Sequence, residues 1–267
     1  MSTLQGRADG RRPLVAFTAP AFLPDLHDDW PLARAALSRL GIGAVAAVWS
    51  DPAVDWSSFD LVVANGAWDN IHQPAEFLAW VDARDLDGVP MVNSPGTLRW
   101  NLDKRYLREL EAMGVAVVPT RWAEPGTNPA FELGSGEVVV KPTVSGGGFK
   151  TARYRPDEHD QARAHVRSLL DGGWTVMVQP YQDAVDSVGE VGLVFVGGAF
   201  SHAMHKDPMI RRGVGPTRSL IDNQVVTPAT ASPAQLELEL LDPVLFFATD
   251  PGGADRFARV LRGYIEY

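Results

Sequence analysis

The chain has 267 residues, 45% of them hydrophobic, and a formal net charge of −9 at pH 7. This length and hydrophobic content are enough for one large domain, or for a few smaller ones, with a substantial core. The acidic charge disfavours a nucleic-acid partner, so any anionic ligand must meet a locally positive pocket. The sequence contains no cysteine, which excludes disulfides, thiolate metal sites and cysteine nucleophiles and is compatible with a reducing compartment.

The N-terminal segment superficially resembles an export signal. Arg11 and Arg12 precede an apolar stretch from Leu14 to Leu23, as in a twin-arginine signal. Prolines interrupt this stretch, and residues 14–19 are better interpreted as a first strand after a disordered tail. No apolar segment reaches the roughly 18 residues of a membrane span. We therefore expect a cytoplasmic protein without a membrane partner.

The first hundred residues alternate between strand and helix patterns, which predicts an α/β domain with parallel strands. The expected strands cover residues 14–19, 44–49, 59–64 and 90–93, and the expected helices cover residues 28–40 and 74–85. A nicotinamide-dependent Rossmann enzyme is disfavoured, because no Gly-x-Gly-x-x-Gly follows the first strand.

Polar residues follow the third strand of this region. Asn65, Trp68 and Asp69 lie where ligands gather in open α/β sheets, at the carboxyl ends of strands. We take them as candidate substrate residues. Trp68 either stacks on a ligand or fills an interface with the next domain, and the sequence does not decide between these two roles.

The pattern of the remaining sequence predicts a second region, of α+β type. We expect a helix after Asn101 that runs to Met113, a helix over residues 156–170, and strands over residues 115–120, 138–140, 151–154 and 175–179. Two further strands flank Gly197-Gly198, a two-residue turn typical of a β-hairpin. His202 and His205 lie on one of these strands, three residues apart, and would face opposite sides, which is poor zinc geometry.

The most informative segment joins an apolar strand to a glycine-rich loop. Val138 to Val140 precede Lys141, and the loop contains Ser145, Gly146, Gly147 and Gly148. Three successive glycines let backbone N–H groups approach a phosphate, while Lys141 adds a positive charge. The lysine precedes the glycines, unlike in a P-loop. A hairpin turn with a solvated lysine is the alternative.

Five segments in order resemble the ATP-grasp family, in its glutathione-synthetase-like branch with O-ureido-serine cyclo-ligase homologues. They are Trp100–Leu107, Val139–Tyr154, Val178–Tyr181, Gly189–His202 and Glu237–Pro243. The resemblance implies an α/β (α+β) fold: an N-terminal parallel α/β domain (1–98) followed by two ATP-gripping α+β subdomains, one central (99–182) and one C-terminal and catalytic (183–267).

The resemblance also implies roles for individual residues. Lys104 and Lys141 would reach the phosphates of ATP, the loop from Ser145 to Gly148 would close over them, and Glu190 would lie near the sugar. Gln179, Pro180 and Tyr181 would border the adenine, although a plain strand-end turn is the alternative for them. Lys206, Arg211 and Arg218 would approach the γ-phosphate or the carboxylate being activated.

Magnesium is expected to bridge the phosphates through carboxylate oxygens. Glu237 and Glu239 are two residues apart on a predicted strand and would face the same side. An acidic stripe facing solvent is the alternative interpretation of this pair.

We therefore predict a Mg²⁺- and ATP-dependent ligase of specialised metabolism that activates a small carboxylic acid as an acylphosphate for attack by an amine, with or without ring closure. A catalytically impaired nucleotide-binding module is the alternative. Related chains carry several tens of additional residues between positions matching Gln235 and Glu237, and an arginine where Asn65 stands. These departures argue against transferring the cyclo-ligase substrate, and the sequence leaves a homodimer open.

Overall fold

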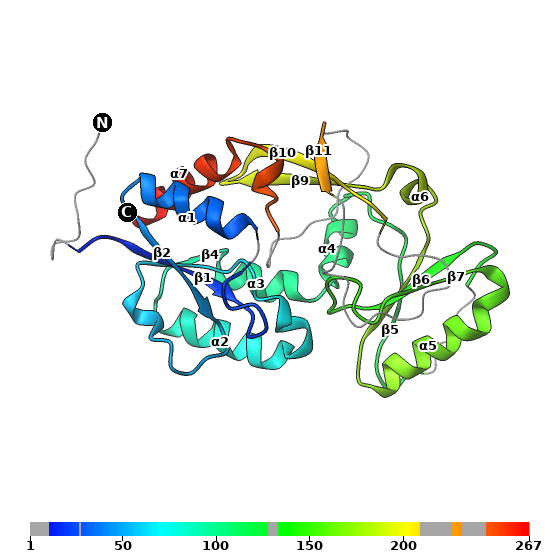
Figure 1. Cartoon of the computed structure of the whole chain (residues 1–267). Helices are drawn as coiled ribbons and strands as arrows, with labels where there is room; N and C mark the ends of the chain where they lie inside the picture. The colour runs from blue at the N-terminus through cyan, green and yellow to red at the C-terminus, as the bar shows by residue number, and fades with distance from the viewer. Residues whose placement is uncertain (1–10, 27, 128–132, 209–225, 231–243, 267) are drawn as a thin grey trace. The chain divides into compact units, whose positions relative to one another are not determined.

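The computed structural model describes residues 11–26, 28–127, 133–208, 226–230 and 244–266. The chain divides into two compact units (Figure 1). The first unit contains residues 1–101, 191–205 and 226–267, and the second contains residues 102–190 and 206–225. The predicted division at residues 98 and 182 stays a hypothesis.

The first unit is built on a parallel sheet, as the strand and helix alternation predicts. Its strands are β1 (Leu14–Ala19), β2 (Gly43–Val48), β3 (Leu61–Val63) and β4 (Met91–Val92), in the order β2-β1-β3-β4. All three strand pairs are parallel. Helices α1 (Asp29–Arg39) and α2 (Pro74–Leu86) connect them, with short 3-10 turns at Trp56–Ser58 and Trp68–His72.

A second sheet in this unit contains β9 (Glu190–Val196), β10 (Ala199–Lys206) and β11 (Val226–Ala229), in the order β11-β10-β9. Gly197 and Gly198, between β9 and β10, have φ angles of 58° and 79°. Both values lie in the left-handed region that a type I′ hairpin turn requires, so the predicted hairpin is confirmed.

The C-terminal helix of the described chain, α7 (Gly253–Ile265), follows a 3-10 turn at Phe247–Thr249 and packs against α1. Helices α2, α5 and α7 have 13 residues each. No helix in the described ranges is long and apolar enough to cross a membrane.

The buried carboxylate of Asp29 joins the two ends of the chain within the first unit. It accepts hydrogen bonds from the backbone N–H groups of Leu245 (2.8 Å), Phe246 (2.7 Å) and Phe247 (2.6 Å). Leu245 and Phe247 belong to the same apolar core as β1 and α1. Because a buried N–H without a partner is costly, Asp29 fixes the C-terminal segment on that core.

The second unit contains an antiparallel sheet in the order β5-β8-β6-β7. Its strands are β5 (Arg121–Ala123), β6 (Val138–Pro142), β7 (Ala152–Tyr154) and β8 (Val176–Pro180). Helix α5 (His159–Asp171) follows a 3-10 turn at Pro156–Glu158 and packs its apolar side on one face of this sheet. The short helix α6 (Ala184–Val188) follows β8.

The helix predicted after Asn101 is interrupted. Helix α3 (Pro95–Leu102) and helix α4 (Tyr106–Ala112) are separated by residues 103–105. The Asp103 side chain accepts a hydrogen bond from the N–H of Arg105 (2.9 Å), and the N–H of Lys104 donates to the carbonyl of Thr143 (3.0 Å). These bonds replace the helical ones, so the prediction of one continuous helix was wrong.

The strand predicted over residues 115–120 was also wrong, because this stretch has no regular secondary structure and the strand lies at β5 instead. Pro119 has no N–H to offer a neighbouring strand. The hydroxyl of Thr120 donates to the carbonyl of Val118 (2.8 Å), a local bond that competes with strand pairing.

Substituting Asp29→Asn tests the role of this carboxylate. We expect the free energy of unfolding to fall by about 1–3 kcal/mol, because an amide nitrogen would face one of three buried N–H donors. Denaturant unfolding followed by tryptophan fluorescence measures this loss. The exposed neighbour Asp28 provides the control, since Asp28→Asn also removes a charge at the start of α1 but breaks no side-chain cap bond. Equal losses in both variants would contradict the assignment.

Candidate functional site

The sheet of the second unit has one face that packs against α5 and another that carries polar groups. Val138 and Val140 belong to the core beneath α5, so Val139 and Lys141 point to the opposite face. The register places Arg153 and Gln179 beside Val139 and Met177 beside Lys141. We call these five residues the lysine face.

The glycine-rich loop begins directly after this strand. Gly147 and Gly148 have φ angles of 53° and 74°, a left-handed conformation that side chains with a Cβ rarely adopt. The N–H of Phe149 donates to the carbonyl of Gly146 (2.9 Å) and closes a turn. Successive amides in such a turn form a concave surface suited to an anion.

Lys104 is held against this loop. Its ammonium donates to the carbonyl of Ser145 (2.6 Å), and its backbone N–H donates to the carbonyl of Thr143 (3.0 Å). The interruption between α3 and α4 makes both contacts available. The structure therefore brings Lys104 into contact with the loop from Ser145 to Gly148. This loop follows Lys141 closely in the chain.

The segment predicted to border a nucleotide base ends β8. The Gln179 side chain is buried and donates to the hydroxyl of Thr120 (2.8 Å), whereas Pro180 is exposed. The N–H of Tyr181 donates to the carbonyl of Glu137 (2.9 Å). Because the Gln179 amide nitrogen already donates to Thr120, backbone groups of this segment would have to recognise a base.

Arg153 is a residue of this face to which the sequence assigned no role. Its side chain is 1% exposed and contacts both Glu137 and Asp186. Asp186 also accepts a hydrogen bond from the Tyr181 hydroxyl (2.6 Å), and burial, followed by this bond, raises the pKa of Tyr181 to about 12. Because Arg153 and Asp186 are 33 residues apart, no local sequence pattern predicts that they pair.

Three predicted substrate residues lie in the first unit. Asp69 is buried, and its carboxylate accepts hydrogen bonds from the N–H of Ala21 (3.0 Å) and from the Trp49 indole. Trp68 is half-buried. The N–H of Asn65 donates to the Thr18 hydroxyl (3.0 Å), while its buried side-chain oxygen has no hydrogen-bond partner among the described residues.

The other predicted residues are distributed as follows. Glu190 begins β9 and Lys206 ends β10, and both are half-buried. Arg211, Arg218, Glu237 and Glu239 lie outside the described residues. Within the described ranges, no group of three or more histidine, aspartate or glutamate side chains is arranged to hold a metal ion.

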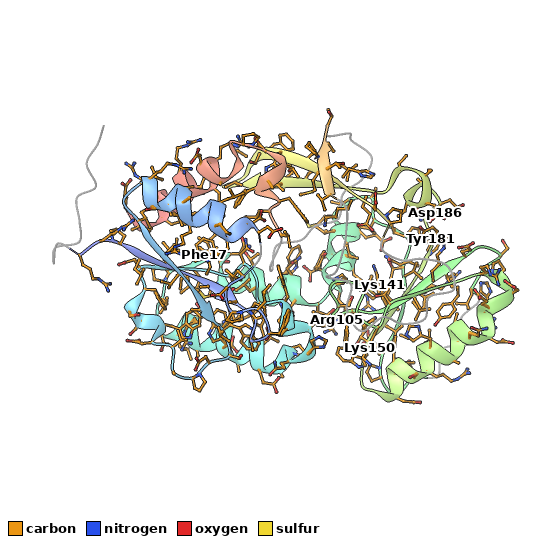
Figure 2. The ribbon with its side chains drawn as sticks, in the orientation of Figure 1. Phe17, Arg105, Lys141, Lys150, Tyr181 and Asp186 are labelled. Atoms are coloured by element: carbon orange, nitrogen blue, oxygen red, sulfur yellow. The ribbon has the colours of Figure 1, made fainter. Side chains whose placement is uncertain are left out.

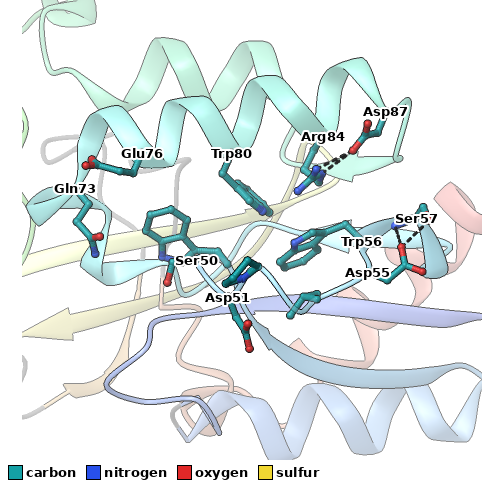
Figure 3. A pocket seen from close by; sticks show the side chains of 13 residues that line it. Ser50, Asp51, Asp55, Trp56, Ser57, Gln73, Glu76, Trp80, Arg84 and Asp87 are labelled. Atoms are coloured by element: carbon teal, nitrogen blue, oxygen red, sulfur yellow. Dashed lines mark hydrogen bonds and ion pairs between the residues drawn. The ribbon is translucent and has the colours of Figure 1, made fainter.

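A separate hollow of about 740 Å³ lies in the first unit, between the segment after β2 and helix α2 (Figure 3). It contains none of the predicted site residues. Its charged lining residues are Asp51, Asp55, Glu76, Arg84 and Asp87. Arg84 is paired with Asp87 (2.7 Å), so the acidic groups dominate and the hollow is unsuited to a triphosphate.

Comparison with known proteins gives consistent results over nearly the whole chain. Residues 14–93 match the family described as D-cycloserine synthetase DcsG, N-terminal domain. The cycloserine biosynthesis protein DcsG of Streptomyces lavendulae is 33% identical over 292 residues, covering 93% of this chain and 97% of that protein. The crystal structure of D-cycloserine synthetase DcsG matches with a TM-score of 0.83 at 30% identity, covering 94% of this chain and 99% of that one.

A RimK domain ATP-grasp protein from Sphaerobacter thermophilus shares the fold, with a TM-score of 0.60 at 20% identity, covering 92% of this chain and 98% of that one. The chain therefore belongs to the ATP-grasp family of ATP-dependent carboxylate–amine ligases. Within this family its similarity is to the D-cycloserine synthetases, which confirms the predicted resemblance and fold class.

The contact between Lys104 and Ser145 makes a prediction that needs no ligand. In a Lys104→Gln variant we expect amides of residues 145–149 to exchange hydrogen faster, because the loop loses a charge-assisted bond. Hydrogen–deuterium exchange measured by mass spectrometry would detect this change.

The adjacent Arg105 supplies the control for this measurement. It lies in the same interruption and pairs with Asp103 (2.8 Å), so Arg105→Gln should leave the exchange of the loop amides unchanged. Identical exchange in wild type and Lys104→Gln would show that the contact does not restrain the loop.

Proposed function

We propose that this protein is a Mg²⁺-dependent ligase that uses ATP to convert a small carboxylic acid into an acylphosphate, which an amine then attacks. The observation that carries the proposal is the grouping of Lys104, Lys141 and the glycine-rich loop within one unit. Ammonium groups and backbone amides are the groups that hold nucleotide phosphates in P-loop proteins. Phosphoryl transfer is catalysed mostly by positioning and by positive groups around the developing negative charge, so it needs no protein nucleophile.

The proposed reaction has two steps. In the first, a carboxylate oxygen of the substrate attacks the γ-phosphorus of ATP, the bond from that phosphorus to the bridging oxygen breaks, and ADP leaves. In the second, the amine nitrogen attacks the acyl carbon, a C–N bond forms, and inorganic phosphate leaves as the amine loses a proton. Positive groups around the phosphates stabilise the negative charge that develops in the first step.

We assign the described groups to the nucleotide as follows. Lys104 and Lys141 would bind phosphate oxygens, the loop from Ser145 to Gly148 would cover them, and Gln179 to Tyr181 would border the adenine. Glu190 would lie near the sugar. The position of Lys141 on a polar sheet face, with the loop directly after it, supports this orientation.

Further proposed roles rest on the family resemblance. Lys206, Arg211 and Arg218 would neutralise the γ-phosphoryl group or the carboxylate, and Asn65, Trp68 and Asp69 would hold the substrate. Glu237 and Glu239 would bind Mg²⁺, since paired carboxylates suit this hard cation, which supplies charge neutralisation between the phosphates. The three-part division at residues 98 and 182 belongs to the same proposal.

The relatives' substrate is not assigned to this chain. D-cycloserine synthetase is similar at 30–33% identity, yet pockets of one fold accept different ligands. The family resemblance also implies an arginine at the position of Asn65. An uncharged amide holds an anionic group less strongly than a guanidinium does. We therefore propose a small carboxylate and an amine, joined between molecules or by cyclisation.

One observation favours a second candidate, a nucleotide-binding protein with impaired catalysis. The alignment with the Streptomyces relative runs over 292 residues, although it covers only 93% of a 267-residue chain. That relative thus contains several tens of positions without a counterpart here. If these positions supply a magnesium ligand in the relative, this chain would still bind the nucleotide but would not catalyse the reaction.

We further propose a cytoplasmic protein that acts on small molecules and binds neither nucleic acid nor membrane. The net charge of −9 and the cysteine-free composition support this setting. A homodimer is compatible with it.

Trapping the intermediate separates the two candidates. The protein is incubated with ATP, Mg²⁺ and a panel of small amino acids and other carboxylic acids that includes O-ureido-serine, with hydroxylamine as the amine. A ligase should release ADP and form the corresponding hydroxamate with at least one acid, because hydroxylamine attacks acylphosphates. Lys141→Ala should reduce this rate about 100-fold or more, which is the size of the loss when one group that stabilises developing negative charge is removed from an active site. Nucleotide binding without acid-stimulated ADP release across the panel would support the impaired module and contradict the ligase.

A further inference from the structure

The segment after β8 is exposed and contributes little to the core. Helix α6 contains no buried residue, and residues 182–184 and 186–188 are exposed. A short helix without apolar burial is marginally stable by itself. Its position must therefore depend on polar contacts.

Arg153 supplies these contacts from the sheet. Its two terminal guanidinium nitrogens donate to the two carboxylate oxygens of Asp186 at 2.8 and 2.9 Å, and its Nε donates to Glu137. The guanidinium carbon lies 3.3 Å from the centre of the Tyr181 ring, and the Tyr181 hydroxyl donates to Asp186. One buried arginine thus fixes both ends of the segment from Tyr181 to Asp186.

The contacts of Arg153 lie on the same sheet face as Lys141. Arg153 lies opposite Val139 on the lysine face, and Lys141 is two residues farther along β6. From Glu137, which Arg153 contacts, to Lys141 the extended chain rises about 13 Å, so the arginine contacts and the lysine lie at separate points along one strand. Figure 2 shows Tyr181 and Asp186 together towards one end of the sheet and Lys150 towards the other, with Lys141 between them.

We propose that Arg153 is a positioning residue for the nucleoside end of the bound nucleotide. It holds the segment from Tyr181 to Asp186 in the conformation that borders the base and sugar, while the lysines and the glycine-rich loop bind the phosphates. This inference rests on the proposed function of the site.

The physical basis is preorganisation. Ordering an exposed segment on binding costs conformational entropy, and a segment that is already fixed avoids this cost. The planar guanidinium fork suits this role because it engages a carboxylate with two parallel bonds and an aromatic ring with its face. Since the guanidinium occupies one face of the Tyr181 ring, a base cannot stack on that face.

Two ligands separate the nucleoside end from the phosphate end. ATP needs both ends, whereas inorganic tripolyphosphate needs only the lysines and the loop. We would titrate wild type and variants calorimetrically with each ligand in the presence of Mg²⁺. Arg153→Met and Asp186→Asn should each weaken ATP binding about tenfold and change tripolyphosphate binding less than twofold. Arg153→Lys keeps the charge without the fork and should restore part of the ATP affinity.

Asp183→Asn serves as the matched control, because Asp183 is exposed at the start of α6 and makes no side-chain cap bond. It should bind both ligands as wild type does. Equal weakening of both ligands in Arg153→Met and Asp186→Asn would indicate general disruption of the unit and overturn the proposal. Unchanged ATP affinity in these variants would overturn it as well. Wild-type protein that binds neither ligand would instead contradict the proposed function.

Discussion

Strand β6 contributes side chains to an apolar core on one face of its sheet and to the candidate site on the other face. Val138 and Val140 pack into the core beneath α5, and this burial directs Lys141 to the opposite face. A register shift of one residue would place the lysine in that core and the valines on the polar face, so the register is strongly constrained. The same pairing sets Arg153 and Gln179 beside Val139. The core packing of this sheet therefore determines where the candidate ligand-binding groups lie.

The proposed binding of a triphosphate to a protein with a net charge of −9 requires local positive charge. The cations of the second unit have different partners. Lys104 is held by the uncharged carbonyl of Ser145, so this contact leaves its positive charge in place for a phosphate. Arg153 contacts the carboxylates of Glu137 and Asp186, which offset its positive charge. It is therefore suited to fixing the position of these residues. This difference in partners separates Lys104, which we propose binds the anion, from Arg153, which we propose shapes the site.

Much of the fold could be predicted because it follows from local patterns. Alternating apolar strands and amphipathic helices predicted the parallel sheet of the first unit, and Gly197-Gly198 predicted the hairpin. The errors arose where distant contacts override local preference. Lys104 interrupts its helix because its N–H bonds to Thr143, and the stretch 115–120 forms no strand because Pro119 and Thr120 disfavour pairing. The pairing of Arg153 with Asp186, and that of Asp69 with Trp49, depend on tertiary structure that no spacing rule reveals.

The other proposed roles all depend on the binding of the ATP phosphates by Lys141 and the glycine-rich loop. The most direct measurement is calorimetric titration of ATP into wild type, Lys141→Ala and Lys150→Ala, each with and without Mg²⁺. Lys150 lies beside the same loop, but its ammonium is positioned over the rings of Phe149 and Trp174, so it is a lysine control with the same charge. We expect that Mg²⁺ strengthens ATP binding, that Lys141→Ala abolishes it and that Lys150→Ala retains it. Equal affinity in wild type and Lys141→Ala, or no binding by the wild type, would contradict it.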